Sequence, residues 1–177
     1  MAGPRKAAGA RELLVLRHAK SDWGESASDF DRPLAKRGRK DAPRVGRWLR
    51  EEGLAPDLVL SSPAKRARET AERVVEALGS DAGEVRWEPR LYDADLGRIL
   101  RVLAEKSVAG RRVLLVGHNP GLEDLVLHLG GDAVAIPGDG KVLPTAAVAR
   151  FRMPPDWGRL PPGSGELLAL VRPAEME

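Results

Sequence analysis

Arg17 and His18 stand side by side where an apolar run ends, at a point where polar side chains are costly unless they serve a purpose. The run is LLVL at 13–16, which is typical of a strand buried on both faces. Two more apolar runs end in polar side chains: DLVLSS at 57–62, followed by Arg66, and RRVLLVGH at 111–118. Guanidinium groups match phosphate oxygens, and imidazole titrates near neutral pH. These three junctions are where chemistry is expected.

An amphipathic stretch follows the first run and predicts a helix. Val45, Trp48 and Leu49 recur at helical spacing. Pro43 precedes this stripe, so the helix either begins near Asp41 or bends at the proline.

The later part of the chain continues the alternation of strand and helix. Ser62 before Pro63 and Asn119 before Pro120 are the predicted N-caps of two helices, each with proline as the first helical residue. The remaining predicted elements are helices at 63–78, 96–103 and 120–129, and strands at 84–87, 145–153 and 166–172.

This alternation predicts an α/β fold, a three-layer sandwich with a mostly parallel central sheet and helices on both faces. The chain has 177 residues, which suits a single domain, expected at 13–177. Residues 1–12, MAGPRKAAGARE, lack the apolar core of a signal peptide, and they are expected to form a disordered lead-in.

Composition narrows the classes of function. The chain has no cysteine, which excludes disulfides and thiolate metal sites. No apolar run approaches the ~20 residues of a membrane span. The formal net charge is +3, a small and scattered excess that does not call for nucleic acid but suits an anionic ligand. A cytoplasmic protein is expected, without nucleic-acid or membrane partners.

The polar junctions should meet, since ligands of open parallel sheets bind beyond the carboxyl ends of the strands. Arg17, His18, Arg66 and His118 would then converge with two helix N-termini, whose free N–H groups favour anions. Such a cluster suits a tetrahedral dianion, and phosphate is the obvious candidate.

Each residue also has an ordinary interpretation when it is taken alone. Arg66 would be a surface residue of a basic helix, and His118 would belong to a capping turn. His18 would be a polar residue of a loop. The third histidine, His128, lies late in an amphipathic helix where a cation is favourable, and it is given no role. Only the joint position of the others at three strand ends favours an anion site.

Four motifs together resemble the histidine phosphatase superfamily, also called the phosphoglycerate-mutase-like superfamily. They are LRHAKSDW, RPLAKRGRKDA, LSSPAKRARETA and VLLVGHNPGLEDL, in that order along most of the chain. Within the superfamily they are similar to the small branch named for phosphohistidine phosphatases. The best-known form of the first motif is Arg-His-Gly, whereas this chain has Ala19, a form that the small branch accepts.

The resemblance implies a role for each residue of the cluster. His18 matches the nucleophile that attacks phosphorus and becomes a phosphohistidine. Arg17 and Arg66 match the arginines that hold the equatorial oxygens, and His118 matches the second histidine, which supports the transition state. Fixed cations would stabilise the charge, so neither a metal nor another cofactor is expected.

The general acid is expected in PRLYDADLG at 89–97, where many superfamily members carry a glutamate at the comparable place. Asp93 falls there and would protonate the departing oxygen, then activate water. Asp93 and Asp95 would equally cap the next helix, a role that suits Asp95. Asp22 and Glu123 are the reserve candidates.

Further residues bear on the pocket. Ser21 would either touch the phosphate or serve as the hydroxyl of a loop turn, and Asn119 is expected to bind substrate. Trp23 would form a wall of the pocket mouth or part of the core. The chain leaves little room for a large lid, and the 130–144 loop is the segment expected to provide one.

These inferences predict a metal-independent phosphatase with an open, shallow site and a covalent phosphohistidine intermediate. The expected substrate is phosphohistidine on a protein. One alternative is a phosphatase that hydrolyses a small phosphate ester, that is, a phosphomonoester. The other alternative is a non-catalytic phosphate-binding module. A mutase would need a closed site that excludes water, which short loops do not favour.

Overall fold

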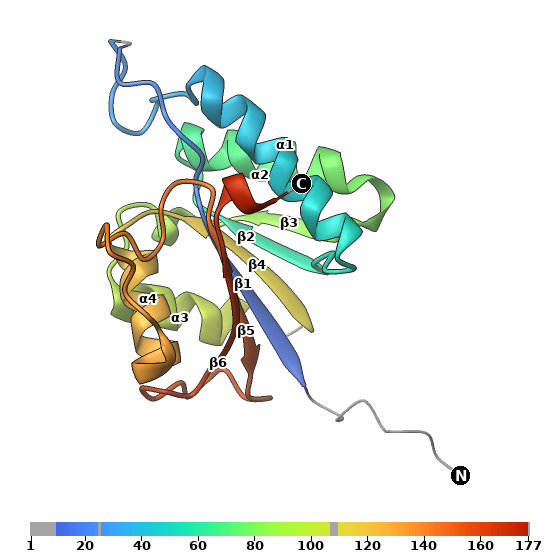
Figure 1. Cartoon of the computed structure of the whole chain (residues 1–177), viewed down its shortest axis with the longest axis vertical. Coiled ribbons are helices and arrows are strands. Elements are labelled where there is room, and N and C mark those ends of the chain that lie inside the picture. The colour runs from blue at the N-terminus through green and yellow to red at the C-terminus, as the bar shows by residue number, and fades with distance from the viewer. Residues whose placement is uncertain (1–9, 25, 107–109, 177) are drawn as a thin grey trace.

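The computed structural model describes residues 10–24, 26–106 and 110–176, and it contains one six-stranded sheet. The strand order is β3-β2-β4-β1-β5-β6, and Figure 1 shows the sheet running through the middle of the molecule. The strands are β1 (Arg11–Arg17), β2 (Leu58–Ser61), β3 (Glu84–Trp87), β4 (Arg112–Gly117), β5 (Val148–Met153) and β6 (Glu166–Val171).

The pairing of the strands fixes which residues meet at the edge of the sheet. β4 lies between β1 and β2 and is parallel to both, whereas β5 is antiparallel to β1 and to β6. Arg17 is paired with Gly117, and Ser61 with Val116. The carboxyl ends of β1, β2 and β4 therefore finish level with one another.

Helices cover both faces of this sheet, and the expected three-layer α/β sandwich is confirmed. Leu14 and Leu16 of β1 point to one face, where they pack with α1 and α2. Leu13 and Val15 point to the opposite face, toward α3 and α4 (Figure 1). This alternation is the side-chain period of a strand that is buried on both sides. The helices are α1 (Lys36–Glu51), α2 (Lys65–Leu78), α3 (Leu96–Lys106) and α4 (Gly121–Gly130).

Helix α1 begins at Lys36, so of the two predicted alternatives the start near Asp41 is wrong, and the helix instead runs through the proline. Pro43 lies inside the helix and costs it one hydrogen bond. The helix continues through the proline because Ala42, Val45 and Leu49 are all fully buried in the core beneath it.

Both predicted N-caps are also wrong. α2 begins at Lys65, and the hydroxyl of Ser62 accepts the backbone N–H of Ala64 ahead of the helix. α4 begins at Gly121, because the amide of Asn119 donates to a carbonyl of a distant loop instead of capping. The two polar side chains follow strand ends as predicted, but neither is the residue that directly precedes its helix.

The lead-in expected at 1–12 falls mainly outside the described residues. Its last two residues, Arg11 and Glu12, belong to β1. Among the described residues, no helix is both long enough and apolar enough to span a bilayer.

Helix α1 presses directly on the segment that follows His18. A Cβ atom added at Gly38 would lie 2.2 Å from the carbonyl oxygen of Lys20, which is backbone and cannot rotate away. The same carbonyl accepts the N–H of Ala35. The glycine therefore allows the first turn of α1 to seat the loop after β1.

We expect Gly38→Ala to lower the free energy of unfolding by about 1–3 kcal/mol, as overpacking does. The clash should outweigh the roughly 1 kcal/mol by which alanine favours a helix over glycine. Denaturant unfolding measures the loss. Gly138→Ala is the control, since a Cβ there meets nothing within 4 Å. Equal stability of the two variants would contradict this account of the contact.

Candidate active site

A pocket of about 290 Å³ opens where β1, β2 and β4 end. The expected anion site is therefore a real depression, and the structure brings six of the predicted residues to it. Ser21 is the predicted site residue that does not line it. The lining residues are Arg17, His18, Trp23, Asp29, Arg32, Arg66, Tyr92, Asp93, Ala94, His118, Asn119 and Pro120.

The imidazole of His18 is held by the residue that follows it. Its Nδ1 lies 2.8 Å from the carbonyl oxygen of Ala19, and the side chain is buried. A carbonyl oxygen only accepts, so Nδ1 must carry the proton. The lone pair of the neutral ring is then on Nε2, which is the atom left to act as a nucleophile.

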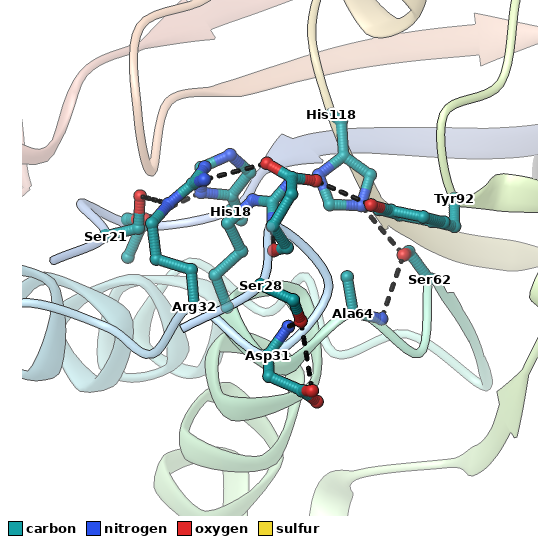
Figure 2. Close-up of polar contacts among 12 residues, drawn as sticks. His18, Ser21, Ser28, Asp31, Arg32, Ser62, Ala64, Tyr92 and His118 are labelled. Atoms are coloured by element: carbon teal, nitrogen blue, oxygen red, sulfur yellow. Dashed lines mark hydrogen bonds and ion pairs between the residues drawn. The ribbon is translucent and has the colours of Figure 1, made fainter. Parts of the chain in front are cut away.

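The second histidine faces the first. The ring centroids of His18 and His118 lie 5.3 Å apart, and the edge of Tyr92 meets His118 at 5.8 Å. The Nε2 of His118 lies 2.7 Å from the hydroxyl of Ser62, which also accepts the N–H of Ala64. Figure 2 shows His118 between His18 and Tyr92, with Ser62 beneath it. Both imidazoles are within reach of a single phosphate.

Both histidines are held neutral. Burial lowers the pKa of His18 to about 3, and the nearby His118, Arg17 and Arg66 act in the same direction. Burial also lowers the pKa of His118 to about 4, with help from Arg66. At neutral pH the Nε2 lone pair of His18 is therefore available.

Two arginines bring positive charge to the pocket, one buried (Arg66) and one half-buried (Arg17). Arg17 donates from Nη1 to the carbonyl of Leu143 at 3.4 Å, and Arg66 donates from both Nη atoms to Asp29. The Nε atoms of both arginines and the Nδ1 of His118 are buried without a hydrogen-bond partner among the described residues. Buried polar atoms normally find partners, and unpaired ones are typical of a site that awaits a ligand.

Asp29 connects the cations of the pocket and was not predicted. Its Oδ1 accepts from Arg32 at 2.7 Å, and its Oδ2 accepts from Tyr92 at 2.6 Å and from Arg66 at 3.2 Å. The hydrogen bond from Tyr92, followed by those from the two arginines, holds the pKa of Asp29 well below its usual range. Sequence offered one signal, an aspartate in a polar loop between two motifs, and this is too common to single out a residue.

Arg32 contacts both Ser21 and Trp23 and thereby explains where each side chain lies. Its Nε donates to the Ser21 hydroxyl at 3.0 Å, so Ser21 is a buried structural hydroxyl rather than part of the pocket lining. The guanidinium lies over the Trp23 ring, 3.6 Å from the ring centroid. Trp23 is 72% exposed and forms a wall of the pocket mouth, which settles the alternative that the sequence left open.

The carboxylates proposed as the acid lie in different environments. Asp93 is exposed in the pocket lining, with a left-handed φ of 54°. Asp95 accepts the N–H of Arg98 and caps α3, as expected. Glu123 accepts the N–H of Leu143, and Asp22 accepts that of Gly24, so both of the reserve candidates serve the backbone.

Thr70 of α2 joins the two principal parts of the site. Its hydroxyl accepts the N–H of Ala19 at 3.0 Å and donates to the carbonyl of Arg66 at 2.7 Å. Thr70 is fully buried. One side chain therefore ties the segment that carries His18 to the helix that carries Arg66.

The loop expected to act as a lid lies beside the pocket. Among the described residues that line the pocket, none comes from 130–144. The carbonyl of Leu143 accepts from Arg17 and from the Asn119 amide, and Asp139 forms an ion pair with Arg172. The loop braces the site from one side. Within the described ranges, no group of three or more His, Cys, Asp and Glu side chains could hold a metal ion.

We expect both pocket histidines to be neutral at pH 7, with Nδ1 of His18 protonated. Adding vanadate or phosphate should raise both pKa values, because a bound anion favours the charged imidazolium. ¹⁵N NMR of the imidazole rings during a pH titration measures this, and the signals of His128, whose Nε2 contacts the Leu160 carbonyl, should not respond to the anion. A ring that is already protonated at pH 7 without anion would contradict this electrostatic description.

Comparisons with known proteins agree with this geometry. The model of the histidine phosphatase superfamily (branch 1) matches residues 13–107. An uncharacterised protein of Mycobacterium tuberculosis is 35% identical over 162 residues, covering 89% of this chain and 99% of the relative.

Solved structures extend the likeness to almost the whole chain. A candidate phosphohistidine phosphatase SixA from Agrobacterium tumefaciens matches with a TM-score of 0.78 and 25% identity, covering 92% of this chain and 97% of that one. The protein histidine phosphatase SixA in complex with tungstate matches with a TM-score of 0.73 and 26% identity, covering 94% and 99%. The chain belongs to the histidine phosphatase superfamily, in the small branch that includes the SixA-like proteins.

Proposed function

We propose that the protein is a metal-independent phosphatase that hydrolyses phosphohistidine on a protein, through a covalent phosphohistidine at His18. The observation that carries the proposal is the pair of facing imidazoles, 5.3 Å apart in a pocket that Arg17 and Arg66 also line. The family to which the chain belongs supports phosphatase chemistry. The tungstate in the SixA structure supports a site for tetrahedral oxyanions, since tungstate has that shape.

In the first step, the Nε2 lone pair of His18 would attack phosphorus while the leaving group departs on the opposite side. The Ala19 carbonyl holds the attacking ring in the required tautomer. Arg17 and Arg66 would hold the phosphoryl oxygens as charge shifts toward them. Water would then hydrolyse the phospho-His18 and release phosphate.

His118 would bind a phosphoryl oxygen through the nitrogen that faces the substrate. The Ser62 hydroxyl fixes the ring orientation at Nε2. Because burial keeps His118 neutral in the free protein, an arriving dianion would favour its protonation and would gain a further charged hydrogen bond. Binding of the anion and protonation of His118 are therefore coupled.

The pocket mouth favours a side chain on a protein over an enclosed metabolite. The 290 Å³ pocket is small compared with typical ligand cavities of about 300–1,000 Å³. Of the described lining residues, four are exposed: Trp23, Asp29, Asp93 and Pro120. A phosphorylated imidazole projecting from a protein surface would enter without a closing lid.

We expect His18→Ala to remove turnover of a phosphohistidine peptide and of para-nitrophenyl phosphate, because it removes the nitrogen that would carry the phosphoryl group. Initial rates measured with and without chelator test the metal independence, and wild-type rates should be unchanged. Rapid quenching with labelled substrate should trap a phosphoenzyme that is labile in acid and stable in alkali, and His18→Ala should form none.

The matched control is His128→Ala, which removes the histidine that the structure places in contact with the Leu160 carbonyl. It should keep full activity and the phosphoenzyme. More than a few per cent of activity in His18→Ala, at native stability, would mean that another residue is the nucleophile. Loss of wild-type activity in chelator would refute metal independence.

A small phosphomonoester is the second candidate substrate, and the placement of Asp93 in the pocket lining favours it. An alkoxide leaves poorly without a proton, whereas para-nitrophenolate leaves readily. If Asp93 is the acid, Asp93→Asn should slow an alkyl phosphate by about 10²–10⁴-fold and barely affect para-nitrophenyl phosphate. The measurement is the initial rate of the wild type and of Asp93→Asn, each on an alkyl phosphate and on para-nitrophenyl phosphate.

Equal slowing on the two substrates would instead indicate a structural role for Asp93. It would contradict the hypothesis that Asp93 is the general acid. Asp95→Asn is the control, because Asp95 caps α3 and does not line the pocket. Because asparagine caps a helix about as well as aspartate, it should leave both the stability and the ratio of the two rates nearly unchanged. A wild type without measurable alkyl phosphate activity would favour the phosphohistidine substrate.

A further inference from the structure

Asp29 places a negative charge in a pocket built for an anion. Its side chain is 54% exposed, so its oxygens are accessible from the pocket. A carboxylate offers about four acceptor positions, and three are occupied by Arg32, Tyr92 and Arg66. Oδ1 has a single donor, which leaves one acceptor position open. Asp29 orders Arg32 and Arg66, but its charge repels phosphate itself, so the exposed acceptor position calls for a further explanation.

Asp29 is not suited to donate a proton. The Tyr92 hydroxyl and the two arginines stabilise its ionised form and hold its pKa well below the usual range. It therefore remains an acceptor at the pH of any plausible assay. The other carboxylate among the described lining residues, Asp93, forms no side-chain hydrogen bond with another described residue and keeps the freedom that an acid needs.

The nucleophile shows what an imidazole requires in this reaction. The nitrogen of His18 opposite the reacting atom carries a proton, and the Ala19 carbonyl accepts it. A phosphohistidine substrate presents a second imidazole with the same need. Its phosphorylated nitrogen points to His18, and the other nitrogen carries a proton when the ring is an imidazolium. That N–H requires an acceptor, and a carboxylate suits a cationic donor best.

We propose that Asp29 is the specificity-determining residue that accepts this N–H and selects the protonated imidazole of phosphohistidine as the leaving group. The inference rests on the proposed function and adds to it the group that recognises the leaving ring. The structure assigns the two imidazoles of the transfer one acceptor each, the Ala19 carbonyl for the enzyme and Asp29 for the substrate.

The electron balance of this step needs no acid. The Nε2 lone pair of His18 forms the new N–P bond, and the N–P bond of the substrate breaks. Its electron pair returns to the substrate ring, which thereby changes from a phosphorylated imidazolium to a neutral imidazole. The N–H facing Asp29 stays where it was. The proton that makes this departure easy comes from solution when the substrate ring is protonated before it binds.

The same carboxylate would act against anionic leaving groups. Sugar phosphates and phosphorylated acids place oxygens, or further negative charge, where the imidazolium would lie. Like charges in a partly buried pocket repel. Asp29 therefore distinguishes a cationic leaving group from the others by charge and by hydrogen bonding together.

The test compares Asp29→Asn with wild type on a phosphohistidine peptide and on para-nitrophenyl phosphate. The kcat/KM for the peptide should fall by about tenfold or more, as expected for a lost charge-assisted hydrogen bond. Because Asp29 also contacts Arg66 and Arg32, the kcat/KM for para-nitrophenyl phosphate should fall as well, but by much less, so that the ratio of the two values drops by about tenfold. The thermal unfolding midpoint reports whether the variant is folded.

Asp31→Asn is the matched control. It removes the same charge from the same loop, but Asp31 contacts Ser28 and does not line the pocket. Both substrates should be turned over normally. A purely structural role of Asp29 in holding Arg66 and Arg32 would slow both substrates alike in Asp29→Asn, and this result would overturn the inference while leaving the proposed function intact.

The pH profile gives an independent measurement. Asp29 should favour the protonated substrate ring in the complex, so the alkaline fall of kcat for the peptide should lie at lower pH in Asp29→Asn than in wild type. An unchanged profile would contradict the proposal. If wild type did not hydrolyse the phosphohistidine peptide at all, the proposed substrate and the inference would both be wrong.

Discussion

The site depends on one constraint, which is that the parallel strands β1, β2 and β4 end in register at the same edge of the sheet. β4 is paired with β1 and with β2, so that Arg17 lies beside Gly117 and Ser61 lies beside Val116. His18, Ser62 and His118 each follow the end of one of these strands. A slip of one residue in either pairing would turn every side chain of the strand to the other face. The buried leucines and valines prevent such a slip, because the side chains on one face of the sheet belong to one core cluster and those on the other face belong to the other.

Burial then decides the electrostatics at that edge. His18 and Arg66 are buried and His118 and Arg17 are half-buried, so that neutral imidazoles and charged guanidinium groups line the same pocket. A nucleophile must be neutral and its surroundings positive, and these two needs conflict in water. The protein meets both because desolvation and positive neighbours act in the same direction on a histidine pKa.

Sequence could predict the features that depend on local pattern. Apolar runs gave the strands, and polar residues at their ends gave Arg17, His18, Arg66 and His118 as neighbours, which the structure brings together. The resemblance to a known family added candidate roles for them, and the comparisons established membership of that family.

The remaining features depend on contacts between distant segments. The caps at Ser62 and Asn119 were wrong because both helices begin later in the chain. The Ser62 hydroxyl contacts His118 as well as the nearby N–H of Ala64, and the Asn119 amide donates to the distant Leu143 carbonyl. Asp29 was missed because its importance comes from Tyr92, Arg32 and Arg66, which converge on it only in the folded chain. No pattern along the sequence marks such a meeting point.

Thr70 separates what is fixed in this site from what is free to change. Its buried hydroxyl sets the position of the His18 segment relative to the helix of Arg66, inside the core and away from the rim. Residues of the rim, such as Trp23 and Asp93, take no part in that link. Mutations can therefore accumulate around the mouth while the spacing of the phosphoryl-binding groups is preserved. A scaffold of this kind can acquire new substrates through its loops without rebuilding its chemistry.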